Sequence, residues 1–475
     1  MNTRRLTKKE MRIFAVGQLG WSILGGIINA WLVTFYLPTK TDITQNGAVS
    51  YLPQGLIIFG GLTILGLIAF ICRIFDAVTD PLIASLSDRS KNPKGRRIPF
   101  MRIAAIPFAV AAVLVFCAPV RAISAVNIVW VLFFLVLFYL FMTMYCTPYN
   151  ALISEFGKTQ EDRMYISTAI SLTFFFGTMI AYLPFVFAGP LRSMIGGDFP
   201  WSYRICFIVL AVIALICMLI PTFKLNEKEF VDAKPSESNA LKSLGKTFRN
   251  KEFLKFSSSD IAYFIALTLF QTGLPFFVKV SMELDESWSM YFLGGMTVLS
   301  ACFYPIVSKL VSKFGKKKLV ILGFLGLSLA YVVTALIGVI PGLKGVLPGI
   351  LIVVICAFPM ALLGIIPQSI VADVAEEDAI TTGEKREGMF FAARTFAMKM
   401  GQSVAMLIFT SLAILGADKL TEASEATNDI TATAEGLRLV AIAAIVFCVL
   451  GALILAFYNE KKVMETISKK DEKAK

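Results

Sequence analysis

The sequence predicts an all-α membrane protein with twelve transmembrane helices in two pseudo-symmetric halves of six. Of its 475 residues, 57% are hydrophobic and 16% are charged, whereas soluble domains carry about 25% charged residues. About twelve apolar segments are long enough to span a bilayer. The basic residues gather in segments 4–12, 89–102, 242–255, 309–318 and 461–475, which the positive-inside rule assigns to the cytoplasm.

The expected spans divide the chain evenly. Residues 1–223 form the first half, with spans at 13–37, 56–88, 98–118, 128–153, 165–187 and 205–223. The hydrophilic stretch 224–252 is interpreted as a cytoplasmic linker. Residues 253–458 form the second half, with spans at 256–280, 288–310, 319–340, 347–372, 389–415 and 435–457. A tail at 459–475 follows, and we expect both termini in the cytoplasm of a multi-pass cell-membrane protein.

Internal resemblance supports two related halves. The second and eighth expected spans end in similar basic motifs, Ser85-Leu-Ser-Asp-Arg-Ser and Ser308-Lys-Leu-Val-Ser-Lys. The fourth and tenth end in Pro148-Tyr-Asn-Ala-Leu-Ile-Ser-Glu155 and Pro367-Gln-Ser-Ile-Val-Ala-Asp373. Such repeats are typical of two-half transporters, although similarity between basic loops can also arise by chance.

The second span carries charges that need a physical reason. A charge near the centre of a membrane helix costs about 2.5–3.5 kcal/mol on insertion scales. Arg73, Asp76 and Asp80 are spaced i, i+3 and i+7, so they share one helical face, and Thr79 adds a hydroxyl at its edge. These groups form a suitable cradle for a small hard cation.

Two interpretations of this face compete. Arg73 could neutralise one aspartate in a purely structural ion pair. One arginine cannot neutralise both Asp76 and Asp80, however, and a bound Na⁺ or proton would remove the remaining negative charge. Pro81 cannot donate a hydrogen bond to the carbonyl of Ala77, which makes one more oxygen available to a cation.

Composition and motifs exclude several classes of protein. The net charge of +12 is explained by the basic loops, so a nucleic-acid partner is unnecessary. The eight cysteines lie in apolar segments without a CxxC pair, and the chain has no histidine, so neither disulfides nor a transition-metal site is expected. No ATP-binding loop or nucleophile elbow is present. We therefore expect no enzyme, no cofactor and no metal beyond Na⁺, and a monomer as the working unit. A sensor or scaffold would leave the acid pair unexplained.

The second-span motif supports a family resemblance. Arg73-Ile-Phe-Asp-Ala-Val-Thr-Asp-Pro81, followed by Asp88-Arg and Gly95-Arg-Arg-Ile-Pro99, resembles the signature of the glycoside–pentoside–hexuronide:cation symporters, the melibiose-permease branch of the major facilitator superfamily. Pro148-Tyr-Asn-Ala-Leu and Val371-Ala-Asp-Val also fit. The resemblance implies the major facilitator fold and symport driven by Na⁺, Li⁺ or H⁺.

The resemblance also implies roles for particular residues. It matches the family's cation site to Asp76, Asp80, Thr79 and Thr143, and places Lys399 between the cation and sugar sites. The aspartates that hold galactosides in melibiose permease fall at Ser22 and Cys146, and two of its pocket tryptophans fall at Asn150 and Gly364. The cation half of the mechanism therefore carries over, whereas galactoside recognition does not.

A solute pocket needs an aromatic plate and several hydrogen-bonding groups. The candidates are Trp21, Ser22, Cys146, Tyr149, Asn150, Gln271, Gln368 and Lys399. Several have structural alternatives: the aromatic residues could belong to the core, and Asn150 and Gln368 could satisfy carbonyls released by nearby prolines. Lys399 could snorkel to the interface, and Asp260 is interpreted as an interfacial residue.

The leading interpretation is a cation-coupled symporter that imports a small polar solute, such as a glycoside or oligosaccharide. A transporter of amphiphiles or lipid headgroups with the same fold is the alternative. Na⁺ is favoured over H⁺, because a hard cation prefers several oxygen ligands and the threonines have no role in carrying a proton. A cytoplasmic gate is expected from Asp88, Arg89, Arg96, Glu155 and Asp373.

Overall fold

The computed structural model describes residues 4–474 except 57, 59–60, 91, 93–94, 231–244, 384–386 and 418–430. In the described part of the chain, all regular elements are helices, apart from one isolated bridge between Ile58 and Leu62. The chain divides into two compact units. Unit 1 comprises Met1–Ser238 and Thr421–Thr431, and unit 2 comprises Asn239–Leu420 and Ala432–Lys475. The division falls inside the stretch 224–252 that was interpreted as a linker.

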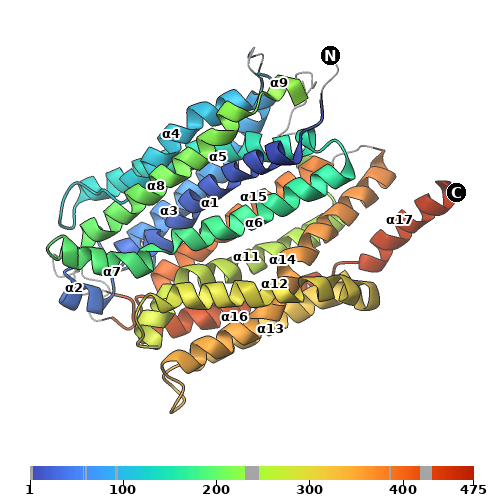
Figure 1. Cartoon of the computed structure of the whole chain (residues 1–475). Coiled ribbons are helices and arrows are strands. Elements are labelled where there is room, and N and C mark those ends of the chain that lie inside the picture. The colour runs from blue at the N-terminus through green and yellow to red at the C-terminus, as the bar shows by residue number, and fades with distance from the viewer. Residues whose placement is uncertain are drawn as a thin grey trace. The chain divides into compact units, whose positions relative to one another are not determined.

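The described residues of unit 1 form six long helices and three short ones, labelled in Figure 1. Its elements are α1 (Lys8–Tyr36), α2 (Lys40–Asn46), α3 (Ile64–Asp88), α4 (Ile98–Leu114), α5 (Ala125–Phe156), α6 (Gln160–Ala181), α7 (Pro184–Met194), α8 (Phe199–Lys224) and α9 (Glu227–Phe230). Helix α1 packs against α6 and α8, α4 packs against α5 and α8, and α3 packs against α5.

Unit 2 repeats this plan. Its elements are α11 (Lys251–Phe276), the π-helix η1 (Phe277–Ser281), α12 (Trp288–Phe314), α13 (Lys316–Leu336), α14 (Val346–Thr382), α15 (Glu387–Leu412), α16 (Ala434–Ala456) and α17 (Glu460–Ala474). Helix α11 packs against α15 and α16, α13 against α14 and α16, and α12 against α14. These five pairs correspond one to one with those of unit 1, so the two six-helix halves share one packing pattern.

Local sequence signals fix where the helices begin. Thr7 caps α1 through a capping box with Glu10, and Thr63 caps α3 by accepting a hydrogen bond from the backbone N–H of Gly66. Ser124 and Asp198 cap α5 and α8 in the same way. These side chains satisfy backbone donors that have no partner inside the helix, so each span starts at a defined residue.

Nine described helices are long and apolar enough to cross a membrane. Helices α3, α4 and α15 lie where the second, third and eleventh spans were expected, but they fall outside this group. Helix α4 has only 17 residues, and α3 carries Arg73, Asp76 and Asp80 along its length. The all-helical membrane fold is confirmed, whereas the count of twelve spans stays a prediction.

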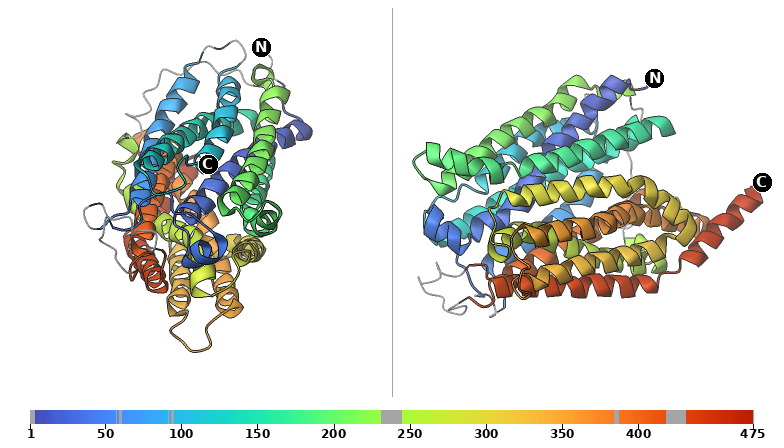
Figure 2. Two further views of the ribbon diagram at one scale, coloured as in Figure 1. Left: turned by 90° about the vertical axis from the view of Figure 1, so that its left-hand side faces the viewer. Right: turned by 60° about the horizontal axis from the view of Figure 1, so that its bottom comes forward.

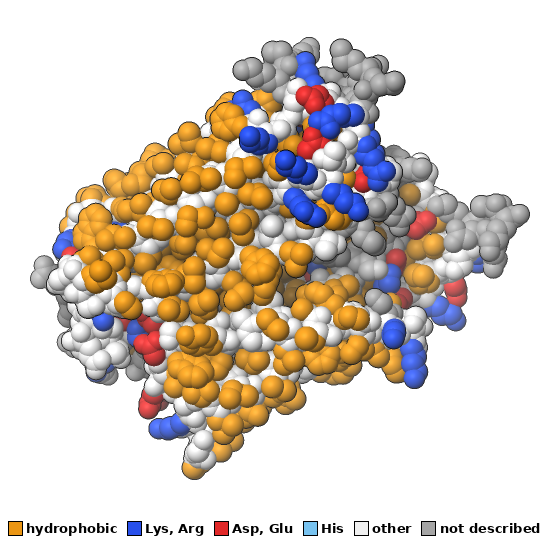
Figure 3. All heavy atoms as spheres, in the orientation of Figure 1, with side chains coloured by type: hydrophobic (Ala, Val, Ile, Leu, Met, Phe, Trp, Pro, Cys, Tyr) orange, Lys and Arg blue, Asp and Glu red, His pale blue; other side chains and the backbone are white. Residues whose placement is uncertain are grey.

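Hydrophobic side chains cover the flanks of the helices, and Lys and Arg gather near helix ends (Figure 3). This distribution is the one expected for helices surrounded by lipid. The predicted tail from residue 459 contains the helix α17, seen from further angles in Figure 2.

Candidate functional site

The α3 helix presents both aspartates from one continuous element. It runs through Pro81 without ending, which membrane helices tolerate where neighbouring groups satisfy the released carbonyl. Asp76 is completely buried, and Asp80 is partly buried one turn further along. The expectation that the two carboxylates share a face is met, because both contact the same residue on α5.

That residue is Thr143. Its hydroxyl lies 2.8 Å from Asp76 Oδ1 and 3.1 Å from Asp80 Oδ1. Thr147, one turn along α5, donates to Asp80 Oδ1 at 3.3 Å. The packing of α3 against α5 thus gathers two carboxylates and two hydroxyls at one place. Sequence reasoning included Thr143 but not Thr147, although its i+4 spacing on the same helix face could have identified it.

The chemistry of this cluster depends on how many protons its hydroxyl groups can donate. A hydroxyl has one proton and two lone pairs, so Thr143 can donate to only one carboxylate at a time. A cation placed among these oxygens would take the lone pairs and reduce the repulsion between the carboxylates. Thr79, the fourth predicted ligand, donates its own hydroxyl to the Asp76 carbonyl at 3.0 Å, and its lone pairs remain on the edge of the same face.

Arg73 is directed mainly at neutral groups. Its Nη2 donates to Asn29 Oδ1 on α1 at 2.6 Å, and its guanidinium lies 4.8 Å from the centre of the Tyr139 ring. The ion pair with Asp76 is long, with Nη1 3.8 Å from Oδ2. Arg73 therefore makes a long contact with Asp76, while Asn29 and Tyr139, which sequence reasoning missed as its partners, hold the rest of its guanidinium.

Two predicted solute residues of unit 1 serve helix packing. Ser22 is buried, accepts a hydrogen bond from Gln18, and faces Gly177, where any larger side chain would collide with it. Tyr149 is fully buried, stacks on Phe14 and donates to the Phe14 carbonyl at 2.9 Å. This geometry favours the core alternative for Tyr149.

The other unit 1 candidates are more accessible. Asn150 is exposed, and Cys146 is partly buried. Trp21 contacts Phe174, with ring centres 6.4 Å apart. Its indole N–H is buried and has no hydrogen-bond partner among the described residues, so it can donate to a bound solute.

The unit 2 candidates lie on three helices. Lys399 on α15 is buried, with 6% of its surface exposed, so the snorkelling alternative does not describe its side chain. Gln271 on α11 is partly buried, and Gln368 on α14 is exposed.

The predicted gate residues form separate ion pairs within each unit. In unit 1, Arg96 and its neighbour Arg97 both contact Glu155 Oε1, at 3.0 and 2.7 Å. In unit 2, Asp373 contacts Lys316 rather than one of the predicted cations. Arg89 is exposed, and the side chain of Asp88 lies outside the described residues.

In each unit a further carboxylate, which sequence reasoning missed, lies beside the ion pair and supports it. Glu227 on α9 accepts hydrogen bonds from the backbone N–H groups of Arg96, Arg97 and Ile98. Glu460 on α17 accepts them from Lys316 and Lys317. A carboxylate at a helix N-terminus is favourable, so α9 and α17 anchor the starts of α4 and α13 in corresponding ways.

Asp260, expected as an interfacial residue rather than a ligand, forms an ion pair inside unit 2. It is buried, with 3% of its surface exposed. Its carboxylate accepts hydrogen bonds from Arg394 Nε at 2.7 Å and Nη2 at 3.3 Å. Arg394 on α15 also lies 5.6 Å from the centre of the Phe264 ring. The pair is bidentate and balanced in charge, which is the geometry of a structural ion pair.

Comparison with known proteins identifies the family. The model of the MFS/sugar transport proteins matches residues 13–461. The chain belongs to this family. It is therefore a membrane transporter of the major facilitator type, and not an enzyme.

Individual relatives agree with this assignment. The chain is 24% identical to a provisionally named sulfoquinovose importer of Escherichia coli K12, over 99% of this chain and 96% of the relative. It is also 24% identical to the sodium-dependent lysophosphatidylcholine symporter 1 of Xenopus tropicalis, over 94% of this chain and 87% of the relative. The crystal structure of the nucleoside transporter NupG has a TM-score of 0.61 at 16% identity, covering 95% of this chain and 99% of that one, and shows the fold alone.

Proposed function

We propose that this transporter is a cation-coupled symporter that imports a small polar solute of the glycoside or oligosaccharide class by alternating access. The observation that carries the proposal is the contact of Thr143 with both Asp76 and Asp80. Two carboxylates held within reach of one hydroxyl are costly in a membrane helix. Reversible binding of a cation there would link the solute cycle to an ion gradient.

The proposed coupling ion is Na⁺, with H⁺ as the alternative. Thr143 and Thr147 add hydroxyl oxygens to the two carboxylates, and a hard cation prefers a set of several oxygens. A proton needs one carboxylate and no hydroxyl. The name of the sodium-dependent relative also supports Na⁺. No other cofactor is proposed.

For the solute, Trp21 offers an indole donor that lacks a partner among the described residues. Gln271, Gln368 and Lys399 are the proposed polar contacts in unit 2. Ser22 and Tyr149 are withdrawn as direct ligands because their polar groups serve helix packing. The sulfoquinovose importer among the relatives supports a sugar-like solute.

An amphiphilic solute is the second candidate. The relative named as a lysophosphatidylcholine symporter matches nearly the whole chain, and the acids that hold galactosides in melibiose permease are replaced here by Ser22 and Cys146. We also propose that the ion pairs of Glu155 and Asp373 stabilise closed cytoplasmic ends during the cycle, that both termini are cytoplasmic, and that the monomer is the working unit.

Purified protein in proteoliposomes tests the proposal. We expect uptake of a radiolabelled glycoside to require an inward Na⁺ gradient and to collapse when the gradient is dissipated. A thermal-shift screen of glycosides and lysophospholipids, each with and without Na⁺, identifies the solute class, because ligands of the folded state raise its apparent stability. If no cation gradient drives uptake of any solute that stabilises the protein, the symport proposal is wrong.

A further inference from the structure

We propose that unit 2 binds an anionic phospholipid in a groove on its surface, formed by α12, α13 and α14. The groove encloses about 340 Å³. Its lining residues are Leu310, Phe314, Lys318, Leu319, Leu322 and Phe358. Lys318 is the one charged residue of this lining, and it lies in the first turn of α13.

The apolar lining suits an acyl chain. Phe314 and Leu322 form exposed walls, with 47% and 48% of their surfaces exposed, and Leu319 is buried at 4%. Exposed apolar residues on membrane helices face lipid tails. Because those tails are as apolar as the groove itself, the lining does not distinguish one phospholipid from another. Selection must come from the headgroup.

Lys318 provides that selection because its neighbours are already engaged. Lys316 pairs with Asp373, and Lys317 donates to the carbonyls of Ala456 and Tyr458. The Lys318 side chain is exposed, and within the described ranges no acidic or carbonyl partner contacts it. Its ammonium group is therefore available to a phosphate.

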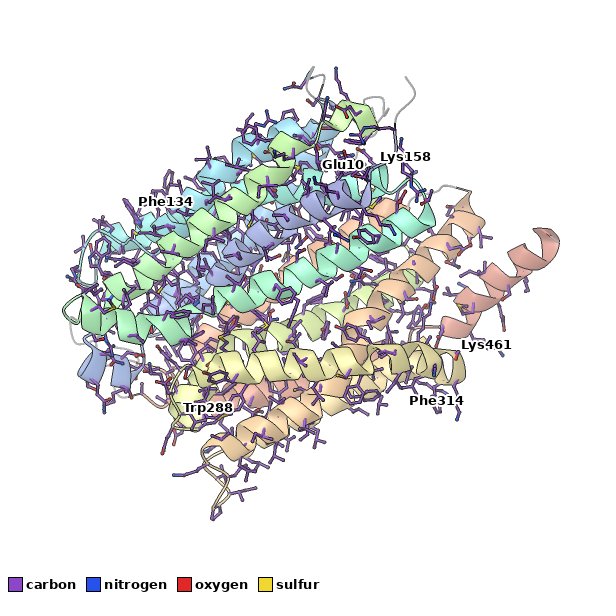
Figure 4. All side chains as sticks on the ribbon, viewed as in Figure 1. Glu10, Phe134, Lys158, Trp288, Phe314 and Lys461 are labelled. Carbon is purple, nitrogen blue, oxygen red and sulfur yellow. The ribbon has the colours of Figure 1, made fainter. Side chains whose placement is uncertain are left out.

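Two further lysines strengthen the positive charge. Lys309 and Lys313 are exposed on the last turns of α12, the segment that also supplies Leu310 and Phe314 to the groove. Figure 4 labels Phe314 at this end of α12. This end of the helices is cytoplasmic in the proposed orientation. A cluster of basic residues beside an apolar groove there attracts anionic lipids of the inner leaflet.

The repeat shows that Lys318 is not required by the shared fold. Gly95 and Gly315 both have a positive φ and lie against Glu227 and Glu460, so the residues after them, Arg96 and Lys316, correspond. On that correspondence Lys318 matches Ile98, which has no charge. The cation at the groove is thus particular to unit 2, as a ligand-binding residue would be.

The test measures lipid retention by the full-length protein with native mass spectrometry, using phosphatidylglycerol and phosphatidylcholine with identical acyl chains. We expect the wild type to retain phosphatidylglycerol preferentially. Lys318→Gln should weaken its retention about fivefold, and Leu322→Trp should weaken it by filling the groove. Lys461→Gln, on exposed α17, and Leu325→Trp, on the exposed α13 surface outside the groove, are the matched controls.

Three results would overturn the proposal. The first is equal retention of the two lipids by the wild type. The second is an equal loss in Lys318→Gln and Lys461→Gln, which would indicate a general surface charge. The third is an equal effect of the two tryptophans. Thermal unfolding without added lipid checks that each variant is folded.

Discussion

The Asp76–Asp80 cluster of unit 1 and the Asp260–Arg394 pair of unit 2 place carboxylates in the helical interior in opposite ways. Asp260 meets one arginine at 2.7 Å, with hydrogen bonds to both of its oxygens. On α3, two aspartates accompany one arginine, which lies 3.8 Å from Asp76 and only 2.6 Å from the neutral Asn29. The first arrangement is balanced by fixed charges, whereas the second gathers hydroxyls around two acids.

The difference teaches how to tell a structural ion pair from a cation site. A buried pair with good geometry needs both partners, because removing one leaves a charge uncompensated. A site for a mobile ion must instead hold the ion reversibly, so a permanent bidentate arginine would compete with it. Asn29 and Tyr139 hold Arg73 so that its contact with Asp76 is long rather than bidentate. The two regions should therefore respond differently to the same kind of substitution.

The largest expected effect is on coupling. Asp76→Asn or Asp80→Asn should abolish Na⁺-driven accumulation, reducing it to simple equilibration across the membrane, because one carboxylate is lost from the ion site. Facilitated exchange of solute and thermal stability should persist. Uptake and counterflow in proteoliposomes measure both processes. Accumulation with normal Na⁺ dependence in either variant would show that the acid pair is structural.

The next effect is on stability. Asp260→Asn should lower the free energy of unfolding by about 3–5 kcal/mol, because Arg394 is then buried without its counter-charge. The double variant Asp260→Leu with Arg394→Met should recover most of this loss, since an apolar pair leaves no charge behind. Thermal unfolding in detergent measures the difference. If Asp260→Asn were as stable as the wild type, the Asp260–Arg394 pair would not be a structural ion pair, and its contrast with the Asp76–Asp80 cluster would be wrong.

Much of this contrast could be predicted from the sequence. Long apolar runs gave helices close to the expected limits, and the i, i+3, i+7 spacing placed Arg73, Asp76 and Asp80 on one face. Thr143 was also predicted as a partner. These features depend on the period of a single helix, or on a motif, and need no knowledge of how helices pair.

The missed features all join residues on different helices. Asp260 and Arg394 are separated by 134 residues, and Glu227 reaches Arg97 across 130. A sequence indicates which face of a helix is polar, but not how that helix is rotated against its neighbours. Several basic residues were therefore equally plausible partners for Asp373. The two alternatives for Tyr149 stayed open for a related reason, since a tyrosine that packs in the core and one that lines a pocket have the same local sequence.

A smaller effect separates the two threonines of the cluster. Thr143→Ala should weaken Na⁺ stimulation about tenfold, the lower end of the effect of losing a group that supports a metal site. Thr147→Ala should have a weaker effect because its contact is longer and reaches only Asp80. Any proton-driven uptake should survive both changes. Thr178→Ala is the control, since that hydroxyl bonds only within α6. If uptake ignores Na⁺ and follows a pH gradient instead, the Na⁺ assignment is wrong.

The smallest expected loss of stability concerns an ion pair outside the membrane-spanning segments, between Arg5 and Asp162. Arg5 Nε and Nη2 donate to Asp162 at 2.6 and 2.7 Å, and the Arg5 side chain is half exposed. These hydrogen bonds lower the pKa of Asp162. Asp162 is buried, but Arg5 is half exposed. Because solvent and salt reach the Arg5 side and screen the pair, Arg5→Gln should cost at most about 1 kcal/mol of stability at neutral pH.

The pH dependence of this loss has a definite sign. A lowered pKa in the folded state means that the stabilisation is present above the ordinary aspartate pKa of about 3.9. It disappears as the pH falls through the lowered pKa, because Asp162 is then protonated in the folded and unfolded protein alike. Unfolding of wild type and Arg5→Gln should therefore converge at low pH and at high salt, whereas Asp260→Asn should remain destabilising in high salt. A difference between wild type and Arg5→Gln that persists after Asp162 is protonated would mean that Arg5 stabilises the protein through packing.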